Sequence, residues 1–231
     1  MSSALAQSPP LAKSGCQSQC GGVTIPYPFG IGPNCYLDEW FSISCNDTYN
    51  PSKPFLNSSK LEVLDVSIEL GTVRVNYPAM STCGDMSNAY VMGLEGGPFV
   101  FSQSNNRFTA VGCNNLALMT MVNGSAIGGC LSFCRSGLTA SSSSSTCNGI
   151  DCCQTTIPSD LQVFNTTIES VETGERTEGC KYAFLVDRQW FENEGLRKAS
   201  DIQNMDSLPV VLEWRIDRRT YDMTRLQRIN Q

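Results

Sequence analysis

Twelve cysteines and no histidine are the feature that most constrains how this 231-residue chain folds. Two chemistries compete for so many thiols, metal coordination and disulfide bonding. The absence of histidine excludes every mixed Cys/His zinc site, and no C-x2-C pair is followed by another at zinc-ribbon spacing. The sequence therefore predicts a disulfide framework made in an oxidising compartment and no metal site. All cysteines are expected to be paired: Cys16, Cys20, Cys35, Cys45, Cys83, Cys113, Cys130, Cys134, Cys147, Cys152, Cys153 and Cys180.

Spacing restricts the pairing at one place only. Cys152 and Cys153 are adjacent, and a disulfide between neighbours is strained, so each is predicted to pair with a different, distant cysteine. The rest of the connectivity stays open at this stage.

Four glycosylation acceptor tripeptides agree with passage through the secretory pathway. They begin at Asn46, Asn57, Asn123 and Asn165. A secreted chain should open with an apolar stretch, yet the longest apolar run in residues 1–15 is Ala4-Leu5-Ala6. We hypothesise that a longer leader has been cut short at this point. The sequence contains no run of 18 apolar residues, so it predicts no membrane-spanning helix.

The net charge of −6 and a pI near 4.7 argue against nucleic acid as a partner. The charge is uneven along the chain, because five arginines crowd the last 17 residues: Arg215, Arg218, Arg219, Arg225 and Arg228.

Hydrophobic periodicity predicts a mainly β, disulfide-rich fold with short antiparallel strands in one or two small sheets. The clearest signal is the alternation of Val73, Val75 and Tyr77 with polar residues. Asn123-Gly124 predicts an exposed hairpin tip. One short helix is expected at 188–198 and a serine-rich loop at 139–146. Strands are expected at 61–68, 73–77, 90–94, 98–103, 107–111, 116–122, 161–168, 181–187 and 209–216.

The expected organisation has four parts. Residues 1–15 form a leader, 16–80 a first cysteine-rich module, 81–216 a second cysteine-rich β module, and 217–231 a basic tail that we expect to be dispensable for folding and binding.

The segment from Cys20 to Gly32 reads CGGVTIPYPFGIG. Pro26 and Pro28 remove backbone donors, so this is a rigid extended segment that presents Tyr27 and Phe29. Aromatic faces pack well against the C–H faces of sugar rings. The alternative is that both rings fill the small core of a disulfide domain, and it is favoured for Phe29.

This segment, followed by Cys35-Tyr36-Leu37 and by Cys45, resembles the galacturonan-binding domain of plant wall-associated receptor kinases. A second stretch resembles the rest of that ectodomain. It includes Gly112-Cys113-Asn114 and Cys147-Asn148-Gly149-Ile150 with Cys152-Cys153-Gln154, and ends with Pro209-Val210-Val211-Leu212-Glu213-Trp214. Together the two stretches cover about 200 residues.

The resemblance implies a non-enzymatic ectodomain in the plant cell wall that binds pectin and oligogalacturonides. Members of that family usually continue into EGF-like repeats, a membrane helix and a cytoplasmic kinase, and none of these motifs occurs in this sequence. Membrane attachment and signalling are therefore in doubt for this chain, and its oligomeric state is open.

Polygalacturonate is a polyanion and the body of this chain is acidic, so local contacts must carry the binding. Candidate carboxylate partners are Lys53, Lys60, Arg74 and Arg107, with Arg74 favoured because it projects from a strand. Tyr27, Phe29, Tyr36 and Trp40 are the aromatic candidates. A bridging Ca²⁺ is the alternative to a direct contact, and no other cofactor is expected.

Two other functions compete with polysaccharide binding. One is a secreted protein- or peptide-interaction module that acts as a soluble decoy. The other is a glycoside hydrolase, for which Asp38, Glu39, Asp85 and Glu95 could supply a carboxylate pair. No nucleophile motif accompanies them, so we do not expect an enzyme.

Overall fold

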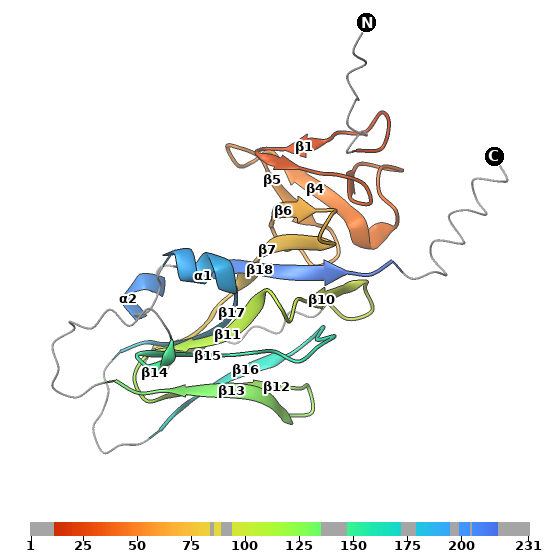
Figure 1. Cartoon of the computed structure of the whole chain (residues 1–231). Coiled ribbons are helices and arrows are strands. Elements are labelled where there is room, and N and C mark those ends of the chain that lie inside the picture. Colours follow the sequence, from red (N-terminus) through yellow and green to blue (C-terminus); the bar gives the residue numbers. More distant parts are fainter. Residues whose placement is uncertain are drawn as a thin grey trace, which may run out of the picture. The chain divides into compact units, whose positions relative to one another are not determined.

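The computed structural model describes residues 12–83, 86–88, 94–134, 147–171, 179–194, 199–203 and 205–216 (Figure 1). The chain divides into two compact units, Met1–Leu70 and Gly71–Gln231. This division falls earlier than the boundary expected near residue 80, because strand β7 (Thr72–Pro78) pairs along its whole length with β18 (Ser207–Trp214). The tail at 217–231, the loop at 139–146, residues 90–93 of the strand expected at 90–94, and Asp85 lie outside the described residues.

Unit 1 is built from short strands and two disulfides. A hairpin joins β1 (Gln19–Cys20) to β2 (Val23–Thr24). β3 (Gly30–Ile31) pairs in parallel with β4 (Ser42–Asn46), which pairs antiparallel with β5 (Lys53–Leu56). A 3₁₀ turn, η1 (Glu39–Phe41), precedes β4, and β6 (Val63–Ser67) follows β5. Cys16–Cys35 and Cys20–Cys45 close the loops between them.

The chain of unit 1 passes close to itself at Gly30. A Cβ atom on Gly30 would collide with the carbonyl group of Cys35, so only glycine fits there. The core beneath consists of fully buried apolar side chains, namely Ile25, Phe29, Phe41, Ile43, Leu56, Leu61 and Val63.

Unit 2 holds the larger sheets, all antiparallel. β10 (Phe99–Phe101), β18 and β7 are neighbours in that order. β14 (Asn148–Ile150), β15 (Cys152–Thr155), β11 (Asn106–Val111), β17 (Lys181–Asp187), β8 (Met80–Cys83) and β9 (Met86–Asn88) form a second sheet. β13 (Ala126–Ser132), β12 (Asn115–Thr120) and β16 (Asn165–Ser170) form a third. Two short helices follow β17, α1 (Arg188–Glu194) and α2 (Ala199–Ile202).

Strand β17 is the centre of unit 2, and all seven of its residues are buried. Phe184 and Val186 pack with Phe191 of α1 and Ile202 of α2 in one hydrophobic cluster. A second group of aromatic rings lies around Phe164, whose ring centroid is 5.4 Å from Phe101 and 6.4 Å from Phe108. Because its apolar residues form a continuous run, the sequence predicted this strand correctly.

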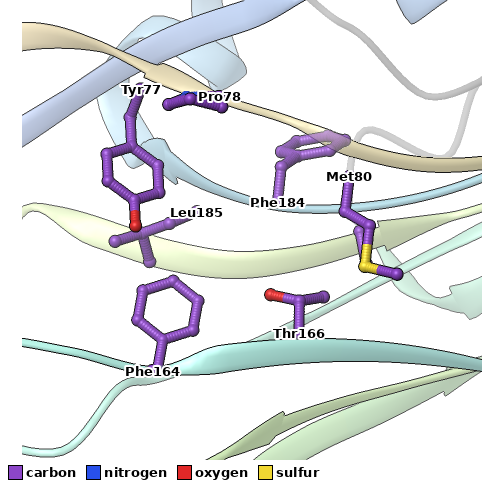
Figure 2. Close-up of a pocket in the computed structure, with 8 residues that line it drawn as sticks. Tyr77, Pro78, Met80, Phe164, Thr166, Phe184 and Leu185 are labelled. Carbon is purple, nitrogen blue, oxygen red and sulfur yellow. The ribbon is translucent and has the colours of Figure 1, made fainter. Parts of the chain in front are cut away.

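A small pocket adjoins these rings. Figure 2 shows Tyr77 and Phe164 at its edge, with Met80, Thr166, Phe184 and Leu185. Its cavity volume of about 10 Å³ is close to the smallest that holds one water molecule. This pocket is therefore a packing feature rather than a ligand site.

All twelve cysteines are paired, as predicted. The bonds of unit 2 are Cys83–Cys180, Cys113–Cys134, Cys130–Cys153 and Cys147–Cys152. The adjacent Cys152 and Cys153 do have different partners. However, the partner of Cys152 is only five residues away, so the expectation that both partners are distant was wrong.

The predicted fold class is confirmed, with differences in detail. The described strands form five sheets rather than one or two, and the β3–β4 pair is parallel. The strand expected at 116–122 ends at Thr120, because the hairpin turn begins at Met121, whose N–H donates to the Ser125 carbonyl. The helix expected at 188–198 is described to Glu194, and residues 195–198 lie outside the described set.

Candidate functional site

Phe29 directly precedes β3 and lies in the core of unit 1. Its side chain is fully buried and its ring meets that of Phe41 edge-on, with centroids 5.1 Å apart. A ring without exposed surface has no face to offer a sugar. The structure therefore supports the core alternative for Phe29, and we remove it from the candidate binding residues.

Tyr27, Tyr36 and Trp40 each keep part of the side chain at the surface. The N–H of Leu37 donates to the Pro28 carbonyl at 3.0 Å, which holds the segments carrying Tyr27 and Tyr36 side by side. Trp40 lies in η1, where its N–H donates to Asp38 Oδ1 at 2.9 Å. These three aromatic residues thus come from two neighbouring segments, held by the Cys16–Cys35 bond.

Acidic side chains accompany this aromatic group. The Tyr36 hydroxyl donates to Glu39 Oε1 at 2.8 Å, and this hydrogen bond is the largest cause of a raised pKa of the Tyr36 phenol. Asp38 and Glu39 would repel a uronate carboxylate that approaches directly. A polyanion can therefore lie here only if a cation compensates these carboxylates.

A different combination of residues occurs around Tyr49, at the turn that leads into β5. We call Tyr49, Lys53, Phe55 and Glu62 the Tyr49 patch. The Lys53 Nζ lies 5.1 Å from the centroid of the Tyr49 ring and 2.9 Å from Glu62 Oε1. Tyr49 is 46% exposed, and its ring is tilted against Phe55 with centroids 6.1 Å apart.

The Tyr49 patch combines the exposed ring of Tyr49 with the partly exposed ammonium group of Lys53. A uronic acid needs this pair of contacts, an apolar face for its C–H groups and a cation for its carboxylate. The sequence analysis named only Lys53 here. The available signal for Tyr49 was its isolation as an aromatic residue in the polar stretch NDTYNPS.

Lys60 is an exposed residue in the turn after β5. Its backbone adopts a positive φ of 60°, and its N–H donates to the Leu56 carbonyl at 2.8 Å. No ion pair of the Lys60 ammonium group occurs among the described residues. Its charge is therefore available to an anionic ligand.

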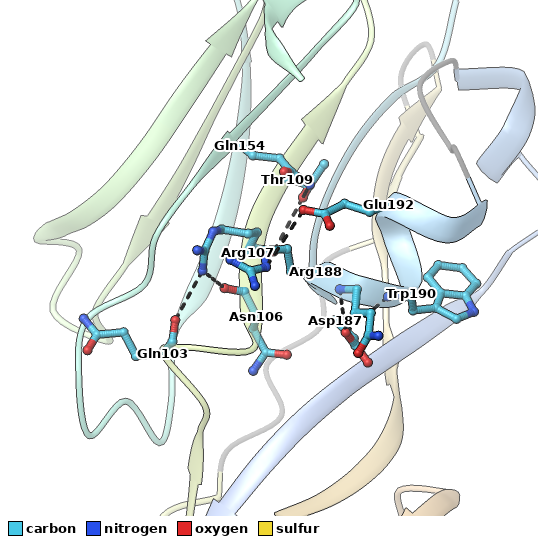
Figure 3. Close-up of polar contacts among 10 residues, drawn as sticks. Gln103, Asn106, Arg107, Thr109, Gln154, Asp187, Arg188, Trp190 and Glu192 are labelled. Carbon is cyan, nitrogen blue, oxygen red and sulfur yellow. Dashed lines mark hydrogen bonds and ion pairs between the residues drawn. The ribbon is translucent and has the colours of Figure 1, made fainter. Parts of the chain in front are cut away.

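Arg74 is already paired inside the protein. Its Nη2 lies 2.9 Å from Asp187 Oδ2, and the Asp187 side chain is only 10% exposed. The other oxygen of Asp187 accepts the N–H groups of Gln189 at 2.9 Å and Trp190 at 3.3 Å, at the start of α1 (Figure 3). We expected Arg74 to be the best carboxylate partner for a ligand. This geometry does not support that expectation, since an internal carboxylate already compensates its charge.

Arg107 also uses hydrogen-bond donors of its side chain for contacts within the protein. Its Nη1 donates to the carbonyl groups of Asn106 at 2.8 Å and Gln103 at 3.3 Å (Figure 3). Arg74 and Arg107 both belong to unit 2, whereas Lys53 and Lys60 belong to unit 1. Neither unit therefore contains all four basic candidates.

Among the described residues, the acidic side chains considered for hydrolysis do not form a carboxylate pair across a cleft. Asp38 and Glu39 are consecutive and accept local hydrogen bonds, Glu95 belongs to unit 2, and Asp85 lies outside the described residues. The described residues contain no group of three or more side chains suited to hold a metal ion. A bridging Ca²⁺ would therefore need ligands from the polysaccharide itself.

The four acceptor asparagines lie in different settings. The Oδ1 atoms of Asn46 and Asn123 accept N–H groups two residues ahead, from Thr48 and Ser125, each at 3.0 Å. Asn57 donates its Nδ2 to Ser42 Oγ at 2.6 Å. Asn165 opens β16 and has a buried Oδ1.

The fold and its bonds define a class of protein, a disulfide-stapled β ectodomain of two units. Comparison with known families then gives the particular family. Residues 16–77 match the wall-associated receptor kinase galacturonan-binding family, and residues 144–223 match the wall-associated kinase family. The chain has the ectodomain of a wall-associated receptor kinase, which confirms the resemblance seen in the sequence.

Individual relatives agree with this assignment. Wall-associated receptor kinase-like 3 of Arabidopsis thaliana is 35% identical over 242 residues, which cover 94% of this chain and 32% of that protein. Wall-associated receptor kinase 2 of Arabidopsis thaliana is 33% identical and covers 89% of this chain and 28% of its own length. The chain thus spans about a third of the curated relatives it matches. No solved structure matches the chain.

The described residues contain no helix that is long and apolar enough to cross a membrane.

Proposed function

We propose that the chain is an extracellular binding module without enzymatic activity, and that its unit 1 binds polygalacturonan of the plant cell wall. The observation that carries this proposal is the match of the galacturonan-binding family to residues 16–77, which include every strand of unit 1. Six disulfides and four glycosylation acceptor sites support an extracellular location.

The Tyr49 patch and Lys60 supply the chemistry in this proposal. A galacturonate carboxylate takes the place of Glu62 on Lys53, and a C–H face of the sugar packs on exposed surface of Tyr49. Lys53 is 41% exposed, so a ligand carboxylate reaches its ammonium group from solvent, whereas Glu62 is 18% exposed. Lys60 meets a second carboxylate of the same polymer.

Binding through Ca²⁺ is the second route. Asp38 and Glu39 stand beside Tyr36 and Trp40, and a divalent cation held jointly by these carboxylates and by uronates would turn repulsion into attraction. The two routes differ in their response to chelation. Direct ion pairs survive a chelator, whereas a Ca²⁺ bridge is lost.

The test is titration of oligogalacturonide into the whole chain by calorimetry, with calcium and with chelator. The variants are Lys53→Ala, Tyr49→Ala and the matched control Lys53→Arg, which keeps the charge. Under direct binding, Lys53→Ala weakens affinity roughly ten- to a hundredfold, as expected when a charge-assisted contact worth about 1.5–3 kcal/mol is lost. Lys53→Arg keeps most of the affinity.

The proposal fails if the unaltered chain binds no polygalacturonate in either buffer. That outcome would favour the protein-interaction alternative, which pull-down with receptor ectodomains would examine. Incubation of the chain with oligogalacturonides, followed by product analysis, tests the absence of hydrolysis.

A further inference from the structure

The sheet β13–β12–β16 has one buried and one outward face. Ala117 and Met119 are fully buried, whereas Leu116 and Leu118 between them are partly exposed. Leu118 lies over Gly129 of β13, because a Cβ atom on Gly129 would be 2.6 Å from Leu118 Cδ2. The outward face of β12 is therefore an apolar surface in contact with solvent.

The tip of the β12–β13 hairpin extends this apolar surface. Val122 is 70% exposed and Met121 48% exposed, among the largest exposures of apolar side chains in the described residues. The Gly124 N–H donates to the Met121 carbonyl at 2.8 Å, and Gly124 has a φ of 83°, so the turn is closed and its side chains are presented outward. A contiguous exposed apolar surface often marks a place where another group binds.

The same tip carries an acceptor asparagine. Asn123 follows Val122 directly, is exposed, and engages its Oδ1 with the Ser125 N–H at 3.0 Å. A second acceptor lies at the same end of the sheet, since Asn165 pairs with Thr120, the last residue of β12. Strand pairing thus brings together two of the four acceptor sites, beside the exposed apolar residues.

We propose that the N-linked oligosaccharide on Asn123 covers Met121 and Val122, with the oligosaccharide on Asn165 bordering the same end of the sheet. In the transfer, Nδ2 of Asn123 attacks the anomeric carbon of a lipid-diphosphate-linked oligosaccharide. The bond from this carbon to the diphosphate oxygen breaks, the N–C bond forms, Nδ2 loses one proton, and the lipid diphosphate leaves. The first sugars then place their C–H faces on the two side chains.

The occupant follows from the point of attachment. A sugar joined to Asn123 starts one residue from Val122 and two from Met121, so it reaches both without a linker. Its hydroxyl groups face water while its C–H faces replace water over the apolar atoms. The glycan therefore makes this tip polar on its outside, independently of what unit 1 binds.

Oxidation of Met121 by dilute hydrogen peroxide reports this cover, because the formation of methionine sulfoxide depends on exposure. For this test, the chain is produced by secretion from plant cells, and the occupancy of each glycosylation site is measured by peptide mass spectrometry. The oxidation of each methionine is then followed with time. Ser125→Ala removes the acceptor site and Ser125→Thr keeps it, and both preserve the backbone N–H that holds Asn123. Thr167→Ala removes the Asn165 site alone. The fully buried Met119 is the internal control.

We expect Met121 to oxidise several-fold faster in Ser125→Ala than in the unaltered chain or in Ser125→Thr, while Met119 stays slow in all of them. Enzymatic removal of glycans from the native chain should give the same increase, which keeps the test valid if Ser125→Ala is poorly secreted. Equal Met121 rates with and without a confirmed glycan would overturn the proposal, as would an unmodified Asn123. A faster rate in Thr167→Ala but not in Ser125→Ala would assign the cover to Asn165 and overturn the assignment to Asn123.

Discussion

Asp187 binds Arg74 with one carboxylate oxygen, at 2.9 Å, and holds the first N–H groups of α1 with the other. Asp187 ends β17, the strand buried along its whole length, so one side chain connects β7, the end of β17 and the start of α1. The pair therefore has a structural role in unit 2, and this role leads to the first two predictions.

Arg74→Ala should destabilise unit 2, because it leaves a nearly buried carboxylate without its cation. Arg74 is about one third exposed, so we expect a loss between the values for surface and buried pairs, about 2 kcal/mol. Chemical denaturation measures this loss. The matched control is Arg188→Ala, whose pair with Glu192 is exposed and 3.9 Å long. A change below about 0.5 kcal/mol is expected for it; equal losses in both variants would contradict the structural role.

Arg74→Ala should leave affinity for oligogalacturonide nearly unchanged under conditions where the variant is folded. Its guanidinium group is paired with Asp187, whereas the Lys53 side chain is 41% exposed and can meet a ligand carboxylate from solvent. Titration of both alanine variants under identical conditions separates them. A tenfold loss for Arg74→Ala with none for Lys53→Ala would return Arg74 to the binding site.

Tyr77 should make the fold sensitive to alkali. Burial raises the pKa of the Tyr77 phenol well above its ordinary value of 10.0. The neutral form is favoured in the folded state, so this contribution to stability is fully present below pH 10 and is lost as the pH rises above it. Denaturation at a series of pH values should show stability falling above pH 10, with a shallower fall for Tyr77→Phe. Identical slopes for the two proteins would contradict this assignment.

The disulfides of unit 2 should differ in what they contribute to stability. Cys83–Cys180 joins residues 97 apart, whereas Cys147–Cys152 joins residues five apart. Loop-closure entropy predicts about 4.7 kcal/mol for the long bond and about 2 kcal/mol for the short one. Paired serine substitutions, compared by chemical denaturation, measure the difference. A larger loss from removing the short bond would show that native-state contacts, and not chain entropy, decide the order.

Local signals explain what the sequence predicted correctly. Alternation identified β7, continuous apolar residues identified β17, and Asn123-Gly124 identified an exposed hairpin tip. Each of these signals spans about ten neighbouring residues or fewer, which is the range over which periodicity and turn-forming residues determine local structure.

The candidate site depends on contacts that no local pattern contains. The partner of Arg74 is far along the chain, so its charge looked available when only neighbouring residues were considered. Phe29 lies in a motif that suits a sugar contact, but parallel pairing of β3 with β4 turns its ring onto Phe41. Tyr49 had no periodic context at all, and only its position beside Lys53 and Phe55 makes it a candidate.

The order of the cysteines also bears on how the chain matures. The four cysteines that pair within unit 1 all precede the eight that pair within unit 2. Twelve thiols released together have on the order of 10⁴ complete pairings, whereas a set of four has 3 and a set of eight has 105. During vectorial entry into the oxidising lumen, the first set can close before the second set emerges. The layout of the bonds thus divides one large combinatorial search into two small ones, in the order of synthesis.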